Sequence, residues 1–86
     1  MDNQRPNYSR TATGLYQFAR DLIVSRPAHH IRPRTTLNDK WVCECLSITL
    51  TQLDAFKVAV RETGRMRVRR AENSYGKSTT YTLTHA

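Results

Sequence analysis

The chain has 86 residues and a mass of 10.0 kDa, the size of one small domain. Such a chain buries only about 60–65% of the surface that its unfolded form exposes, which leaves room for one small core and a shallow binding face. The net charge of +7 comes mainly from arginine, which provides eleven of the fourteen basic residues. Because a guanidinium group pairs well with phosphates and carboxylates, this bias indicates a polyanionic partner and excludes an acidic mimic of nucleic acid.

Membrane and secreted proteins are excluded by the pattern of apolar residues. No apolar run approaches the about 18–20 residues of a membrane span, and the polar N-terminus has no stretch typical of a secretory signal. Cys43 and Cys45 are too close in sequence to close a disulfide loop, which fits a reducing compartment. We expect a cytoplasmic protein with no membrane partner.

The first part of the chain predicts an arm, a helix and a loop. Residues 1–12 are polar and aperiodic, so we expect a flexible basic arm before a single domain at residues 13–86. Thr13 then caps an amphipathic helix that ends at Ser25. Its apolar stripe consists of Leu15, Phe18, Ala19, Leu22 and Ile23. Residues 26–35 hold two prolines and three arginines, which predicts an exposed basic loop.

Residues 36–48 are compatible with a helix or a strand. As a helix they begin at the cap Thr36, and one face carries the apolar residues Leu37, Trp41, Val42, Cys45 and Leu46. This interpretation places Trp41 and Cys45 in the core and leaves Cys43 partly exposed. As a strand the segment has good propensity around Trp41, although the alternation of apolar and polar residues fails at Val42 and Leu46. We favour the helix and keep the element order αβαββ as the alternative.

The second half of the chain predicts a helix and a β-hairpin. Thr49 and Gln52 form a capping box ahead of a helix whose buried stripe is Leu50, Leu53, Phe56 and Val60. Gly64 lies where a left-handed residue ends such a helix. Residues 65–69 and 79–84 alternate in character, which predicts two strands joined by a polar turn. One face of this hairpin is apolar, with Met66, Val68, Tyr81 and Leu83, and the other carries arginines and threonines.

These elements resemble the winged helix-turn-helix superfamily of DNA-binding proteins. Residues 41–56 (WVCECLSITLTQLDAF) are similar to its two-helix unit, and residues 61–70 (RETGRMRVRR) to the passage from the recognition helix into the wing. The resemblance implies an α+β fold, with a small domain of three helices followed by a C-terminal β-hairpin wing. In such a fold the recognition helix enters the major groove with its first residues nearest the base edges.

The resemblance implies which residues contact DNA. From the recognition helix and the wing, these are Thr49, Thr51, Gln52, Lys57, Arg61, Arg65, Arg67, Arg69, Arg70 and Lys77. The arm and the loop add the possible contacts Arg5, Arg10, Arg32 and Arg34. Two structural interpretations remain open beside these roles. Thr49 and Gln52 could act as helix caps, and the wing arginines could be charges that protect the edge of a sheet.

The charge is concentrated on either side of the predicted core helices. Residues 5–34 hold six arginines and one aspartate, a net charge of +5, and residues 61–77 hold six basic residues and two glutamates, a net charge of +4. We therefore expect a small sequence-specific protein that binds double-stranded DNA, a transcription regulator of the compact basic type common in phages and plasmids. A homodimer would supply the affinity that one small module lacks. An acidic protein partner and RNA are the alternatives.

Enzymatic and metal chemistry are not expected. Cys43, Glu44 and Cys45, together with three histidines, suggest a zinc site, but zinc sites space their cysteines by two to four residues. The chain has no glycine-rich phosphate loop and no paired carboxylates near a candidate cleft. We predict no enzyme activity, no metal and no cofactor.

Overall fold

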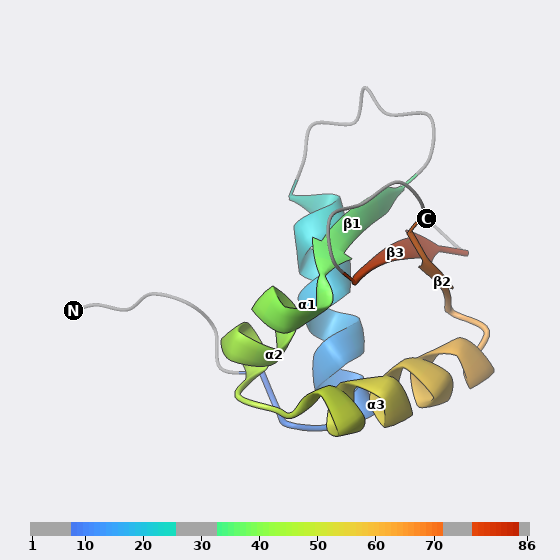
Figure 1. Ribbon diagram of the computed structural model, residues 1–86. Helices are drawn as coiled ribbons and strands as arrows, with labels where there is room; N and C mark the ends of the chain where they lie inside the picture. The colour runs from blue at the N-terminus through green and yellow to red at the C-terminus, as the bar shows by residue number, and fades with distance from the viewer. Residues whose placement is uncertain (1–7, 26–32, 72–76, 85–86) are drawn as a thin grey trace.

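The computed structural model describes residues 8–25, 33–71 and 77–84 (Figure 1). In chain order these residues form α1 (Ala12–Val24), β1 (Arg34–Asn38), α2 (Asp39–Leu46), α3 (Leu50–Glu62), β2 (Met66–Arg70) and β3 (Ser78–Leu83). The fold is α+β, with three helices and a small three-stranded antiparallel sheet. The predicted loop at residues 26–35 lies largely outside the described residues, and its last two residues belong to β1.

The sheet has the strand order β1-β3-β2, so β3 is its central strand. β2 and β3 pair antiparallel, which confirms the predicted hairpin. β1 adds a third strand to it, so the hairpin is not a simple C-terminal extension. Thr82 of β3 shows the arrangement, because it lies opposite Arg67 of β2 on one side and opposite Arg34 of β1 on the other.

The structure of residues 34–46 differs from both predictions made for residues 36–48. A strand runs to Asn38 and a helix begins at Asp39. The favoured helix is therefore confirmed for residues 39–46, its predicted start at Thr36 is wrong, and the alternative order αβαββ is wrong. Thr35 and Leu37 are buried between exposed neighbours, and this alternation lets the segment pair with β3. The cap of α2 is Asn38 instead of Thr36: its side chain accepts a hydrogen bond from the backbone N–H of Trp41 at 3.0 Å.

The later start of α2 changes which of its side chains are buried. The core receives Val42, Cys43 and Leu46, whereas Trp41 is 40% exposed, so its placement in the core was wrong. The two cysteines are also reversed, because Cys43 is buried and Cys45 is half-buried. Burial raises the pKa of the Cys43 thiol, and the nearby carboxylate of Asp39 raises it further.

α1 begins with Thr11 as its cap, two residues before the predicted Thr13. The residues ahead of it pack against the helix. Tyr8 contacts Phe18 edge to face, with ring centroids 5.4 Å apart, and its hydroxyl donates a hydrogen bond to Asp21 at 2.6 Å. Gly14 permits the approach, because a Cβ there would lie 1.8 Å from the carbonyl oxygen of Ser9. Of the predicted arm, residues 8–12 therefore lie at α1, and residues 1–7 are outside the described part.

A short turn joins α2 to α3, and local hydrogen bonds define where α2 ends and where α3 begins. Ser47 has a left-handed backbone, with φ 58° and ψ 48°, and its N–H donates to the carbonyl of Cys43. Thr49 and Gln52 form the predicted capping box, with hydrogen bonds of 3.1 and 2.9 Å between side chains and backbone. At the other end of α3, Gly64 has a φ of 75°, which confirms the predicted left-handed residue.

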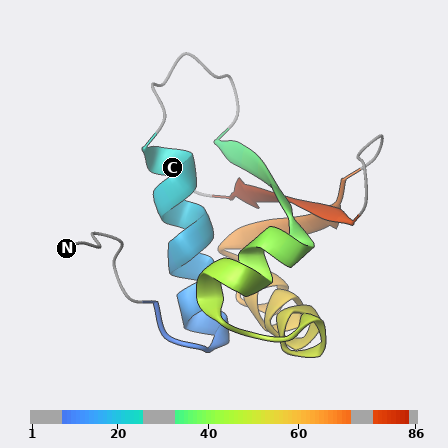
Figure 2. The same cartoon turned by 60° about the vertical axis from the view of Figure 1, so that its left-hand side comes forward.

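The core lies between the helices and one face of the sheet, called here the inner face. The predicted apolar face of the hairpin is buried there, with Met66, Val68, Tyr81 and Leu83 all at 8% exposure or less. α1 contacts β1 and α3, and α3 contacts β2, so the helices gather on this side (Figures 1 and 2). No described helix packs on the opposite face, which is called here the outer face.

Candidate nucleic-acid interface

Basic side chains from α3 and the hairpin converge at one cleft of about 290 Å³, called here the α3–hairpin cleft. Its lining includes five basic residues that the sequence analysis selected, namely Lys57, Arg61, Arg69, Arg70 and Lys77. The carboxylates in its lining are Asp39 and Asp54, so the cleft has a net charge of +3. The tertiary structure thus brings together residues that are up to twenty positions apart in the sequence.

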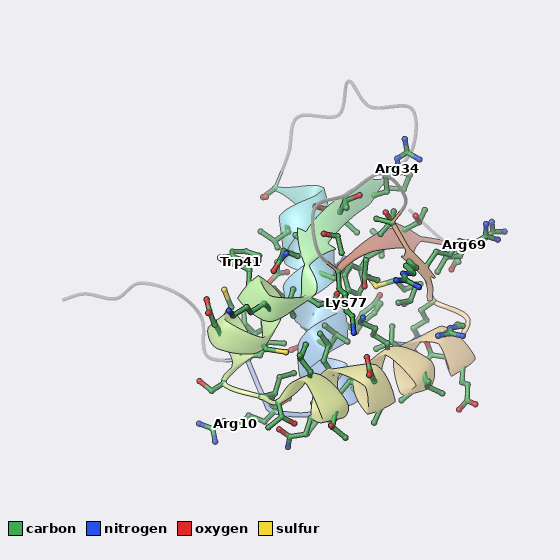
Figure 3. All side chains as sticks on the ribbon, viewed as in Figure 1. Arg10, Arg34, Trp41, Arg69 and Lys77 are labelled. Carbon is green, nitrogen blue, oxygen red and sulfur yellow. The ribbon has the colours of Figure 1, made fainter. Side chains whose placement is uncertain are left out.

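The register of the sheet explains why Arg70 belongs to this cleft. Arg70 lies opposite the buried Thr79, in the same row as the buried Leu37, so it extends from the inner face. Lys77 lies immediately before β3, and its carbonyl accepts a hydrogen bond from the backbone N–H of Asp39 at 2.8 Å. Figure 3 shows Lys77 between the sheet and α3. The end of the hairpin that carries Arg70 and Lys77 is therefore basic on its inner side.

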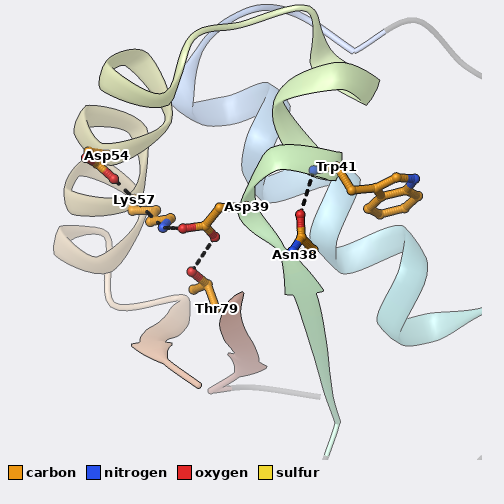
Figure 4. A network of polar contacts seen from close by, with 6 residues as sticks. All are labelled: Asn38, Asp39, Trp41, Asp54, Lys57 and Thr79. Atoms are coloured by element: carbon orange, nitrogen blue, oxygen red, sulfur yellow. Dashed lines mark hydrogen bonds and ion pairs between the residues drawn. The ribbon is translucent and has the colours of Figure 1, made fainter. Parts of the chain in front are cut away.

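A largely buried ion pair occupies the inner end of the cleft (Figure 4). Lys57 Nζ lies 2.8 Å from Asp39 Oδ2, and the two side chains are 13% and 9% exposed. Thr79 Oγ1 donates to the other carboxylate oxygen of Asp39 at 2.7 Å, and Asp54 lies 3.9 Å from Lys57. The charge of Lys57 is therefore compensated within the protein. The cations left for a ligand are Arg61, Arg69, Arg70 and Lys77.

The outer face of the sheet carries a second group of arginines. Two rows run across its three strands: Arg34, Thr82 and Arg67 form one, and Thr36, Thr80 and Arg69 form the other. Thr36 and Thr80 also share a hydrogen bond of 2.8 Å between their hydroxyl groups. The predicted lattice of arginine and threonine is thus present. β1 extends it with Arg34 and Thr36, which the sequence had placed in a loop and at a helix cap.

The first turn of α3 uses two of its predicted base-reading residues as caps. Thr49 and Gln52 are exposed, but each side chain has an oxygen occupied by the capping box. Thr51 is exposed and lies on the outward side of the helix. At helical spacing from Thr51, the exposed residues Ala55, Val58 and Glu62 complete the outward face of α3. This face is mostly small and apolar. The exposed carboxylate of Asp54 lies beside it, together with the basic side chains of α3.

The remaining predicted contacts are spread over the molecule. Arg65 is exposed and lines a separate cavity of about 160 Å³ between α1 and α3. Arg10 and Arg34 are both exposed, and Figure 3 shows Arg10 far from Arg34 and Arg69. The structure therefore does not bring Arg10 to the outer face. Arg5 and Arg32 fall outside the described residues.

Sequence reasoning missed Asp39 as a site residue and the true place of Arg34. Asp39 was not among the predicted site residues, and its contacts with Lys57 and Thr79 join α2 to α3 and to β3. A signal was present for Arg34, because it begins an alternation with Thr35, Thr36 and Leu37 that is typical of a strand. The prolines and histidines ahead of it hid this pattern.

Among the described residues, no group of three or more His, Cys, Asp or Glu side chains could hold a metal ion. No helix in the described ranges is both long and apolar enough to cross a membrane. No family model, curated protein or solved structure matches the chain.

Proposed function

We propose that this protein binds double-stranded DNA through the α3–hairpin cleft and the adjoining outward face of α3, as a winged helix-turn-helix regulator does. In this proposal α2, its turn and α3 form the helix-turn-helix, and β2 with β3 forms the wing. The observation that carries the proposal is the α3–hairpin cleft. There Arg61 of α3 and Arg70 and Lys77 of the hairpin lie beside the exposed face of α3. Phosphate contacts of this kind hold a protein in register on a duplex.

The side chains on the outward face of α3 suit a close approach to a groove. Thr51, Ala55 and Val58 are exposed and short, so they keep the helix backbone near its ligand. Apolar groups of this size contact the thymine methyl group, and a threonine hydroxyl also accepts or donates a hydrogen bond. Base reading is therefore assigned to Thr51 and to this apolar face, and Thr49 and Gln52 keep their role as caps.

Duplex binding is tested by fluorescence anisotropy with labelled duplex, single-stranded DNA and RNA, at about 50 and about 150 mM salt. We expect micromolar binding that prefers the duplex. With about four phosphate contacts, one for each free cation of the cleft, the slope of log K against log salt concentration is about −3 to −4. An interface with an acidic protein that uses apolar anchors would respond much less to salt. Absence of duplex binding at the lower salt concentration would refute the proposal.

A pair of matched variants tests whether the cleft is the site. Arg61→Gln with Arg70→Gln removes two cleft charges, and we expect it to weaken duplex binding by about tenfold or more at about 100 mM salt. Arg20→Gln with Lys40→Gln removes the same charge from exposed positions on α1 and α2, and we expect affinity to change by less than about twofold. Equal losses in the two variants would mean that net charge, not the cleft, governs binding.

A further inference from the structure

The outer face of the sheet presents two arginines, Arg34 and Arg67, that do not line the α3–hairpin cleft. Side chains alternate between the two faces of a strand, so Arg67 points away from the side where Val68 and Arg70 meet α3. Arg34 lies in the same row as Arg67, across Thr82. Arg69 belongs to the outer face by register and also lines the rim of the cleft. The outer face therefore has its own cations, Arg34 and Arg67, directed away from α3.

The charges on the outer face are unpaired among the described residues. Neighbouring Cα positions along a strand of one face are about 7 Å apart, and positions two strands away are about 10 Å apart, so the three arginines start from one compact area of the sheet. Its six residues are Arg34, Thr36, Arg67, Arg69, Thr80 and Thr82, and none of them is acidic. No described ion pair involves these arginines. Like charges at such distances repel one another, and a bound polyanion relieves that repulsion.

The chemistry of this face favours phosphates of a duplex over other polyanionic partners. Protein interfaces have an apolar centre, but the large apolar side chains exposed in the described part of the molecule are Val24, Trp41, Leu50 and Val58, none of which lies on the outer face. Single-stranded nucleic acid is held by stacking on aromatic side chains, and the aromatic residue of β3, Tyr81, is fully buried on the inner side. Arginine and threonine alone are typical of contacts with a phosphate backbone.

We infer that the outer face is a second duplex-binding surface, so that one molecule bridges two duplex segments. This inference rests on the proposed function for the first segment, which the α3–hairpin cleft binds. Arg67 and Arg70 extend from opposite faces of β2, and Arg34 lies on the same face as Arg67. A duplex lying flat against Arg34 and Arg67 therefore does not contact Arg70. Bridging then follows from the distribution of basic residues over both faces of one sheet.

Edge protection is the competing explanation, since charged side chains on edge strands prevent sheets from pairing with one another. β1 and β2 are the two edge strands, and they carry all three outer-face arginines. Edge protection explains only why the sheets of two molecules do not pair with one another, and for that a charge on each edge strand is enough. It gives no reason for binding a second duplex, so the two explanations differ in a measurable way.

Bridging is measured as energy transfer between a donor-labelled duplex and an acceptor-labelled duplex, with one protein molecule for every two duplexes. The wild-type chain should give energy transfer. Arg34→Gln with Arg67→Gln should reduce the transfer by about fivefold or more and change the affinity for a single duplex by less than about threefold. Arg20→Gln with Lys40→Gln, which removes the same charge elsewhere, should retain both. Light scattering during chromatography reports whether each variant keeps the wild-type mass.

The possible outcomes separate this inference from the proposed function. Duplex binding without energy transfer in the wild-type chain overturns bridging and leaves the proposed function standing. Energy transfer that persists in Arg34→Gln with Arg67→Gln also overturns it, because bridging then comes from elsewhere, for instance from a dimer. Absence of all duplex binding overturns the proposed function and the inference together. In that event, binding of polyglutamate that is lost in Arg34→Gln with Arg67→Gln would assign the outer face to an acidic protein.

Discussion

Asp39 and Lys57 form an ion pair 2.8 Å long between the first turn of α2 and the middle of α3. The same carboxylate accepts a hydrogen bond from Thr79, so one side chain links two helices and the central strand. Lys57 falls on the side of α3 that faces the sheet, where many helices carry an apolar residue. Its charge is tolerated because Asp39 is buried beside it, and the pair sets the position of α3 against the hairpin.

Removing one member of this pair should destabilise the fold. Lys57→Met leaves the Asp39 carboxylate buried without its cation, and we expect a loss of about 2–3 kcal/mol in the free energy of unfolding. Asp39→Asn with Lys57→Met removes both charges together, so we expect it to recover to within about 1 kcal/mol of the wild type. Urea denaturation measures both. If Lys57→Met were as stable as the wild type, the ion pair would have no structural role.

The same double variant tests whether Lys57 contacts DNA. Asp39→Asn with Lys57→Met does not alter the net charge, and Lys57 is already compensated in the free protein. We therefore expect the affinity for a duplex to stay within about twofold of the wild type. A much weaker affinity in a variant that folds normally would return Lys57 to the set of DNA contacts.

Thr51 and Gln52 should respond differently to substitution with alanine. Gln52→Ala removes half of the capping box, and we expect a stability loss of up to about 1 kcal/mol with little change in sequence preference. Thr51→Ala should leave stability nearly unchanged and alter the preferred sites in selection from a random duplex library, because Thr51 is exposed and has no role as a cap. The reverse pattern would assign base reading to Gln52.

Tyr8 should titrate at an unusually high pH. Its hydrogen bond to the Asp21 carboxylate favours the neutral phenol and, with partial burial, raises the pKa of Tyr8 from 10.0 to about 12. A raised pKa means that this contact stabilises the fold at pH values below 10, and that the contribution is lost as the pH rises toward 12. The difference in ultraviolet absorbance between wild type and Tyr8→Phe should show one phenol titrating near pH 12. Titration at pH 10 would mean that residue 8 is not held against α1.

Ser47 is a position where glycine should stabilise the protein. The left-handed backbone at Ser47 is strained for a residue with a Cβ, by about 1 kcal/mol, and glycine adopts it freely. The greater entropy of glycine in the unfolded chain offsets part of this gain. We expect Ser47→Gly to raise the free energy of unfolding by about 0.5 kcal/mol, as measured in urea. Ser47→Ala keeps the strain and serves as the control. A loss of stability in Ser47→Gly would show that the serine side chain is needed in the turn.

The sequence by itself determined the elements whose signals are local. The stripe of α1, the capping box of Thr49 and Gln52, the left-handed Gly64 and the alternation of β2 and β3 depend on residues within a few positions of each other, and each of these features is present. Hydrophobic periodicity also gave the inner and outer faces of the hairpin. The ends of the elements were predicted less accurately than their type: α1 is capped by Thr11 and not by the predicted Thr13.

Only the tertiary structure decided the pairing of β1 and the make-up of the cleft. The strand at Arg34–Asn38 gains its hydrogen bonds from β3, more than forty residues later in the chain, and no local pattern identifies that partner. The start of α2 then follows from Asn38, which moved Trp41 to the surface and Cys43 into the core. Asp39 and Lys57, separated by eighteen positions, meet for the same reason. Contacts between distant residues depend on how the faces of separate elements pack, and periodicity within one element does not encode that packing.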